Sequence, residues 1–204
     1  MYLNERKINK FFLYWLFASL TLVFLIIIVG GLTRLTDSGL SITEWELFKG
    51  LLPPLSDNSW NLYFEEYKKI PQYKLLNSGM SIDEFKVIFY WEYFHRILAR
   101  LIGLFFLIPL IYFYVSKKIR NNYINTCFLI FVLIISQGII GWFMVQSGLV
   151  NDVTVSHYRL SIHLATAIII ISSIYWLLMN TNSKQNKIFF KFSNTNLPFQ
   201  ILIL

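Results

Sequence analysis

The stretch that decides the fold is FFLYWLFASLTLVFLIIIV, residues 11–29, a run of 19 residues without a charged side chain. A helix rises about 1.5 Å per residue, so a run of this length can cross the roughly 30 Å hydrocarbon core of a bilayer. Two further uncharged runs, residues 126–145 and 160–179, have 20 residues each. A fourth apolar run, residues 91–115, carries its charges only in its first ten residues. The chain is therefore predicted to cross a membrane four times.

The overall composition is that of a membrane protein and excludes an ordinary soluble domain. Of the 204 residues, 56% are hydrophobic and only 14% are charged. The formal net charge of +7 arises from Lys and Arg residues that gather outside the apolar runs. A membrane topology accounts for this distribution, so no nucleic-acid partner is expected.

The distribution of Lys and Arg also predicts the orientation of the spans. Residues 1–10, 116–122 and 180–191 together hold nine basic residues and one acidic residue. Residues 30–90 hold six basic and eight acidic residues, and residues 146–158 hold no Lys or Arg. The positive-inside rule places the N-terminus in the cytoplasm and the segments 30–90 and 146–158 outside. We expect an all-α, up-down four-helix transmembrane bundle with spans at about 11–29, 91–115, 124–145 and 159–179.

The first outer loop, residues 30–90, is too long for a structureless connection and is expected to contain short helices. Ser41 and Glu44 have the spacing of a capping box that starts a short helix. Ser81 and Glu84 form a second capping box, which is expected to start the helix that continues into the second span. An amphipathic helix, lying on the membrane surface or capping the bundle, is indicated by aromatic residues at i, i+3, i+4 and i+7. These residues are Trp60, Tyr63, Phe64 and Tyr67.

Two histidines are predicted to lie at the same depth in the membrane. His95 is near the outer start of the second span, and His163 is about one turn past the outer end of the fourth. Both lie within roughly 6 Å of the outer boundary by helical rise. The second and fourth spans of an up-down bundle are diagonal partners, and two such histidines can hold a heme iron from both sides. His95 and His163 are therefore the candidate metal ligands, whereas His157, in the second outer loop, is expected to be solvated.

Small residues are positioned beside both histidines, where they leave room for a flat ligand. The alternative is that they only allow membrane helices to pack closely. These residues are Ala99, Gly103, Gly138, Gly141 and Ala167.

Other polar residues near the outer boundary are candidates for the same site. Glu92 precedes His95 by three residues, so its carboxylate suits proton transfer near a reacting carbon; the alternative is a structural salt bridge to Arg96 at i+4. Gln137 either hydrogen-bonds into the cavity or joins two helices. Arginine side chains can pair with carboxylates such as heme propionates, or they can snorkel to lipid headgroups. The arginines at this end are Arg34, Arg96, Arg100 and Arg159.

Several motifs, in order, resemble the N-terminal half of the heme A synthase family of proteobacteria and mitochondria. They are GGLTRLTDSGLSITEW (30–45), LLPPLS (51–56), EFKVIFYWEYFHRILAR (84–100), SQGIIGWFMVQSGL (136–149) and VSHYRLSIHLATA (155–167). The cysteine pair that some bacterial members carry in the first outer loop is absent, which fits the other subtype.

The resemblance implies a function. Heme A synthases oxidise the C8 methyl group of heme O to a formyl group by successive hydroxylations, which makes heme A for cytochrome oxidase. The family fold is two four-helix bundles, eight spans in all. The family's essential glutamate and first histidine match Glu92 and His95, and the second histidine matches His163. The N-terminal half is associated with the substrate heme and the C-terminal half with a heme b cofactor.

The resemblance also sets expectations for domains and partners. Residues 1–196 are expected to form the N-terminal bundle and residues 197–204 the start of a truncated fifth span, so the heme b site lies in the missing half. The implied partners are heme O, heme O synthase, membrane lipid and further copies of the chain. The implied location is the cell inner membrane, with the histidine pair near the periplasmic side. The residues alone leave open an alternative, a di-histidine b-type heme protein that transfers electrons or delivers heme without oxidising it.

Overall fold

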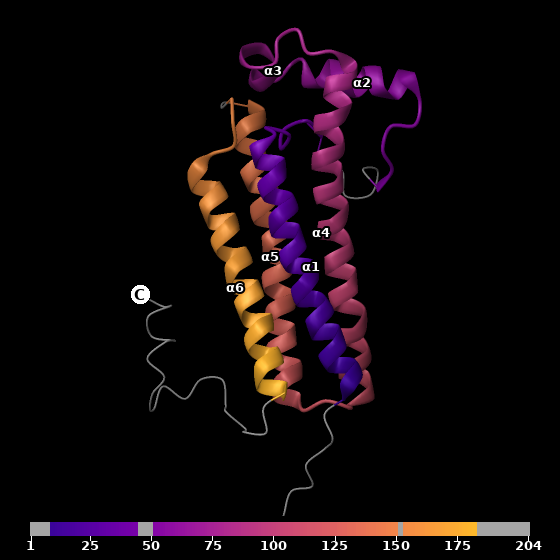
Figure 1. Ribbon diagram of the computed structural model, residues 1–204, viewed down its shortest axis with the longest axis vertical. Coiled ribbons are helices and arrows are strands. Elements are labelled where there is room, and N and C mark those ends of the chain that lie inside the picture. The colour runs from indigo at the N-terminus through magenta and orange to yellow at the C-terminus, as the bar shows by residue number, and fades with distance from the viewer. Residues whose placement is uncertain (1–8, 45–50, 151–152, 183–204) are drawn as a thin grey trace, which may run out of the picture.

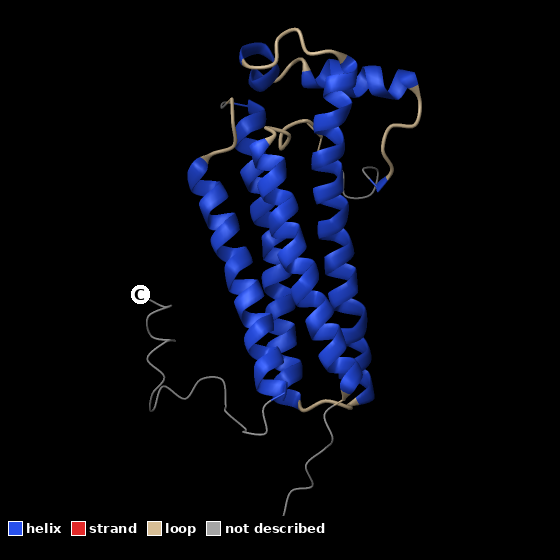
Figure 2. Ribbon diagram, viewed as in Figure 1, coloured by secondary structure: helices blue, strands red, loops and turns tan. Residues whose placement is uncertain are grey.

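The computed structural model describes residues 9–44, 51–150 and 153–182. Within these ranges it contains helices and no strands (Figures 1 and 2). The helices are α1 (Lys10–Leu35), α2 (Asp57–Tyr67), α3 (Pro71–Leu75), α4 (Ile82–Ser116), α5 (Asn121–Val150) and α6 (His157–Asn182). The basic residues predicted near the two chain ends, Lys10 excepted, and the apolar tail 197–204 lie outside the described residues.

The four long helices form the predicted four-helix bundle. Helix α1 packs against α4 and α6, and α5 packs against the same two helices, so α1 lies opposite α5 and α4 lies opposite α6 (Figure 1). Each of these four helices is long and apolar enough to cross a membrane. The expected fold class and the diagonal placement of the second and fourth spans are both confirmed.

The helices extend beyond the uncharged runs because their polar ends are capped. Helix α4 starts at Ile82, well before the apolar run that begins at Trp91. The predicted capping box is present: Ser81 Oγ accepts from Glu84 N at 3.3 Å, and Glu84 Oε2 accepts from Ser81 N at 2.8 Å. This cap satisfies amide groups that the first turn of a helix leaves unpaired.

Helix α2 covers the outer extension of α4, and α3 lies against the outer end of α5 (Figure 1). The aromatic stripe of α2 is buried there, with the rings of Trp60 and Phe89 centred 5.0 Å apart and those of Phe64 and Phe85 also 5.0 Å apart. This amphipathic helix therefore caps the bundle, which is one of the two placements predicted for it.

A buried tyrosine joins these short helices to the end of α1. Tyr67 donates its hydroxyl to Gln72 Oε1 at 3.0 Å and accepts from Asn77 Nδ2 at 2.7 Å. Gln72 Nε2 in turn donates to the backbone oxygen of Asp37 at 3.0 Å. Burial raises the pKa of Tyr67, so the phenol keeps the proton that it donates to Gln72.

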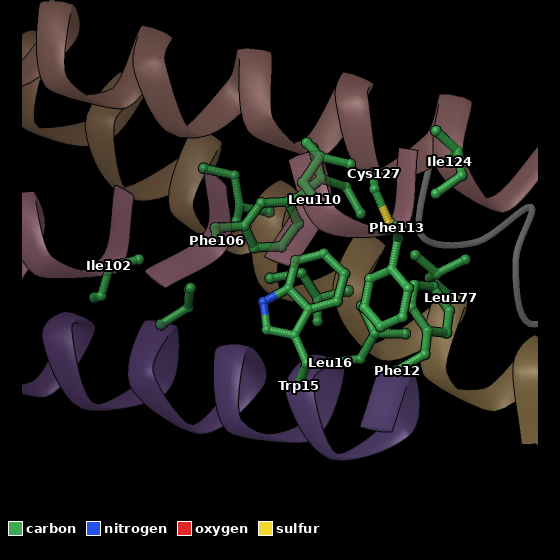
Figure 3. Close-up of a cluster of buried hydrophobic side chains, with 14 residues drawn as sticks. Phe12, Trp15, Leu16, Ile102, Phe106, Leu110, Phe113, Ile124, Cys127 and Leu177 are labelled. Carbon is green, nitrogen blue, oxygen red and sulfur yellow. The ribbon is translucent and has the colours of Figure 1, made fainter. Parts of the chain in front are cut away.

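The main hydrophobic core fills the half of the bundle far from α2 and α3 (Figure 3). Trp15 on α1 donates its indole N–H to the backbone oxygen of Phe105 on α4 at 3.1 Å. Pro109 stands four residues after Phe105 inside α4 and has no N–H to offer that oxygen. The indole therefore supplies the hydrogen bond that the proline removes from the helix.

This arrangement gives a testable prediction for the core. Trp15→Phe should lower the free energy of unfolding by about 1 kcal/mol for the lost hydrogen bond, in addition to a change in packing. In a Pro109→Ala background the alanine N–H can pair with Phe105, so the same substitution should cost less. Thermal unfolding of the purified protein in detergent measures both values, and an equal cost in the two backgrounds would contradict the pairing.

Candidate functional site

The two predicted ligand histidines lie on the diagonal helices of the bundle. His95 is on α4 and His163 is on α6, and both side chains are half-buried. They are 68 positions apart in the sequence, and the bundle places them on two helices that lie diagonally opposite each other.

Each imidazole lies against a glycine of a neighbouring helix. A Cβ atom placed on Gly30 of α1 would lie 3.2 Å from Nε2 of His95, and one placed on Gly141 of α5 would lie 3.2 Å from Cε1 of His163. Both distances are shorter than the 3.5–4.0 Å typical of non-bonded carbon contacts. Only a residue without a side chain fits at either position with the ring where it is.

The residues at this site fit a heme. Nδ1 of His163 is buried and makes no hydrogen bond to any described residue. A buried polar atom without a partner is uncommon, and imidazole nitrogen is a usual axial ligand of heme iron. A Cβ placed on Gly103 would meet nothing within 4 Å, so there is open space on the histidine stripe of α4. Two imidazoles on diagonal helices, an unpaired nitrogen and the open space at Gly103 suit a flat iron-bearing ring.

Gln137 joins two helices, which is one of the two roles predicted for it. Its Nε2 donates to the backbone oxygen of His163 at 2.8 Å. Gln137 Oε1 is buried and has no partner among the described residues. The amide therefore anchors α6 to α5 at the histidine and leaves one acceptor in the same region.

Glu92 is buried at the centre of a hydrogen-bonded cluster. Its Oε1 pairs with Arg96 Nη2 at 2.5 Å, and its Oε2 accepts from Ser41 Oγ at 2.7 Å and from Ile42 N at 2.8 Å. Arg96 also donates to the backbone oxygen of Ile42 at 3.1 Å. We call Ser41, Ile42, Glu92 and Arg96 the carboxylate clasp. It ties the segment after α1 to the turn of α4 that precedes His95, and the expected salt bridge between Glu92 and Arg96 is part of it.

The clasp corrects one prediction. A helix was predicted to start at Ser41, with Ser41 and Glu44 as its capping box. This start is wrong, because residues 42–44 are not helical. The hydroxyl of Ser41 binds Glu92, which is 51 residues away, instead of the local backbone. Leu40 beside it is buried against Gly148 of α5, so this segment spans the outer end of the bundle from α4 to α5.

The other candidate arginines have protein partners near the outer end. Arg34 pairs with Asp37 at 3.3 Å, and both side chains are exposed to a large extent. Arg159 donates to the backbone oxygen of Phe143 at 2.6 Å and stacks over its ring. Arg100 follows Arg96 by one turn of α4 and is half-buried. The remaining histidine, His157, is exposed at the start of α6, as expected of a solvated residue.

Two contributions to the site had no clear signal in the sequence. Gly30 was not predicted, although it is at the outer end of the first span, at the depth expected for both histidines. A search for glycines at that depth on the helices without histidines would have found it together with Gly141. Ser41 could not be found this way, because its partner is remote in sequence.

Comparisons with known proteins agree with the motifs. Residues 13–202 match the model of a family described as cytochrome oxidase assembly protein. The chain is 55% identical, over 88% of its length, to the heme A synthase of Pelagibacter ubique, and 51% identical over 81% to that of Nitrosospira multiformis. It is 47% identical, over 85% of its length, to the heme A synthase-mitochondrial ferredoxin fusion protein of Schizosaccharomyces pombe.

These alignments cover 54%, 47% and 29% of the three relatives. The chain thus spans about half the length of the two bacterial proteins and less of the fusion protein. No solved structure matches the chain.

Proposed function

This chain belongs to the cytochrome oxidase assembly protein family that includes the heme A synthases, and from that premise we propose that it is the substrate-heme half of such an enzyme. The reaction is the oxidation of the C8 methyl group of heme O to a formyl group, which gives heme A. The observation that carries the proposal is the pair of imidazoles on diagonal membrane helices, each beside a glycine.

In this proposal His95 and His163 bind the heme from opposite faces. The backbone of His163 is held by Gln137, which limits how far that ligand can move. Arg34, Arg100 and Arg159 lie toward the outer end and are proposed to bind the propionates. Arg96 is proposed to act by holding Glu92 in the carboxylate clasp. Ligation of the iron by the two histidines would orient the porphyrin within the bundle.

Glu92 is proposed to accept protons in this reaction. Oxidation of a methyl group to a formyl group with an oxygen atom from water releases protons, together with electrons that an acceptor outside this bundle must take up. A carboxylate one turn before an iron ligand is suitably placed to receive the protons. Its hydrogen bonds to Ser41 and Ile42 fix the carboxylate in one position. A proton acceptor that is already held in position lowers the free-energy cost of reaching the geometry in which the proton is transferred.

The proposal includes a location and partners. Residues 1–196 form the N-terminal bundle, with the N-terminus in the cytoplasm and the histidine pair near the periplasmic face of the inner membrane. Heme O synthase is the proposed source of the substrate, and a heme b cofactor is proposed to bind outside this bundle. The topology is supported by the charge distribution of the loops.

Conversion of heme O tests this function. Membranes that contain the complete protein should convert added heme O to heme A, measured by extraction and chromatography of the pigments. Membranes without the protein are the control. A reversible b-type spectrum with no heme A formed would contradict the synthase and favour an electron carrier.

A further inference from the structure

Gly30 and Gly141 differ from the other described glycines in what they face. A Cβ on Gly31, Gly103 or Gly138 would meet nothing within 4 Å. Only at Gly30 and Gly141, among the glycines that the structure describes, would it meet a histidine, in both cases at 3.2 Å. The neighbouring Gly31 is also in α1 but is exposed and faces open space, so the contact with a histidine is specific to Gly30 in this helix.

The atoms at these contacts belong to the metal-binding side of the rings. At Gly30 the nearest atom is Nε2 of His95, one of the two imidazole nitrogens that can bind a metal. At Gly141 the nearest atom is Cε1 of His163, which is bonded to both ring nitrogens. A methyl group at either position would therefore displace the part of the ring from which a bond to iron extends.

The two glycines are on the helices that carry neither histidine. A planar ring held between α4 and α6 must point its edges toward α1 and α5, because these complete the bundle. Gly30 is on α1 and Gly141 is on α5. Each glycine is therefore placed where one edge of the ring would approach a helix.

We infer that Gly30 and Gly141 are positioning residues of the proposed heme site, which set the orientation of the two imidazoles and leave room for the edges of a planar tetrapyrrole. This inference rests on the proposed function. Each of the four helices then contributes a histidine or a glycine to the surroundings of the ring.

Alanine substitutions with a matched control test the inference. Gly30→Ala and Gly141→Ala are each compared with Gly31→Ala in α1, because Gly31 is exposed and faces no histidine. The gain in helix propensity is the same in all three variants, so the contact with the histidine is what distinguishes them. Purified variants are titrated with heme, and the absorption spectrum and midpoint potential of the bound fraction are recorded.

We expect Gly30→Ala and Gly141→Ala to weaken heme binding about 10- to 100-fold, as for other residues that orient a metal ligand. The heme that stays bound should show a shifted spectrum and potential, because a displaced imidazole is a different ligand. The control variant Gly31→Ala should keep the wild-type affinity, spectrum and potential. A purely structural role would lower the folded fraction and leave the spectrum of the bound heme unchanged, which would overturn the inference.

Two failures can be told apart. If the wild-type protein binds heme and Gly30→Ala behaves as Gly31→Ala does, the inference is wrong and the proposed function stands. If the wild-type protein binds no heme, the proposed function is wrong and the inference falls with it.

Discussion

Replacing His95 or His163 by alanine is expected to abolish stable heme binding. A bis-histidine site loses half of its axial ligation with either substitution, and the apolar space left by the ring supplies no other ligand. Among the described residues no group of three or more His, Cys, Asp or Glu side chains is placed to hold a metal ion, so no nearby cluster can replace the lost imidazole. Heme per protein after purification is the measurement.

The third histidine gives the control for this prediction. His157 is exposed at the start of α6, so His157→Ala should keep the full heme content and spectrum. The double variant His95→Ala/His163→Ala should bind no heme at all. Full heme content in that double variant would show that the heme lies elsewhere.

Glu92→Gln is expected to leave heme bound but to reduce conversion of heme O about 100- to 10,000-fold, the range for loss of a group that transfers protons. Glutamine has nearly the shape of glutamate and can still accept the N–H of Ile42 through its amide oxygen. It cannot take up a proton at neutral pH, so binding and conversion should separate. The substitution also removes the charge that pairs with Arg96, which is largely buried, so a loss of stability is expected as well.

Ser41→Ala separates chemistry from stability in this prediction. It removes one hydrogen bond to the carboxylate and keeps the charge of Glu92, at an expected cost of about 1.5–3 kcal/mol for a bond to an ionised group. If Glu92 transfers protons, Ser41→Ala should convert heme O far faster than Glu92→Gln at similar stability. Unchanged conversion in Glu92→Gln would show that Glu92 takes no part in the reaction and serves only to hold the carboxylate clasp together.

The spans were predictable because a long uncharged run leaves few alternatives to a membrane helix. The ends of the spans were less predictable. Helix α4 begins at Ile82 rather than near Trp91, since a hydropathy run marks only the part of a helix that meets hydrocarbon. The capping box at Ser81 and Glu84 did indicate this start, because capping is a local interaction that spacing alone encodes.

The parts of the site that could not be predicted depend on remote contacts. Ser41 and Glu44 have the same local spacing as Ser81 and Glu84, but Ser41 forms a stronger, charge-assisted bond with Glu92. Gly30 was ambiguous because glycine in a membrane helix usually serves close packing. The histidine pair could be found because depth and topology together restrict which residues can meet across a bundle.

The most direct test of the central claim is the identity of the pigment in the purified protein. Heme O, heme A and heme B differ chemically, so acid extraction and chromatography distinguish them. The account predicts that the protein carries heme O or heme A, and that the His95→Ala/His163→Ala variant loses this pigment. A protein that carries heme B alone, or a variant that keeps its heme O, would contradict the assignment of this bundle as the substrate-heme site.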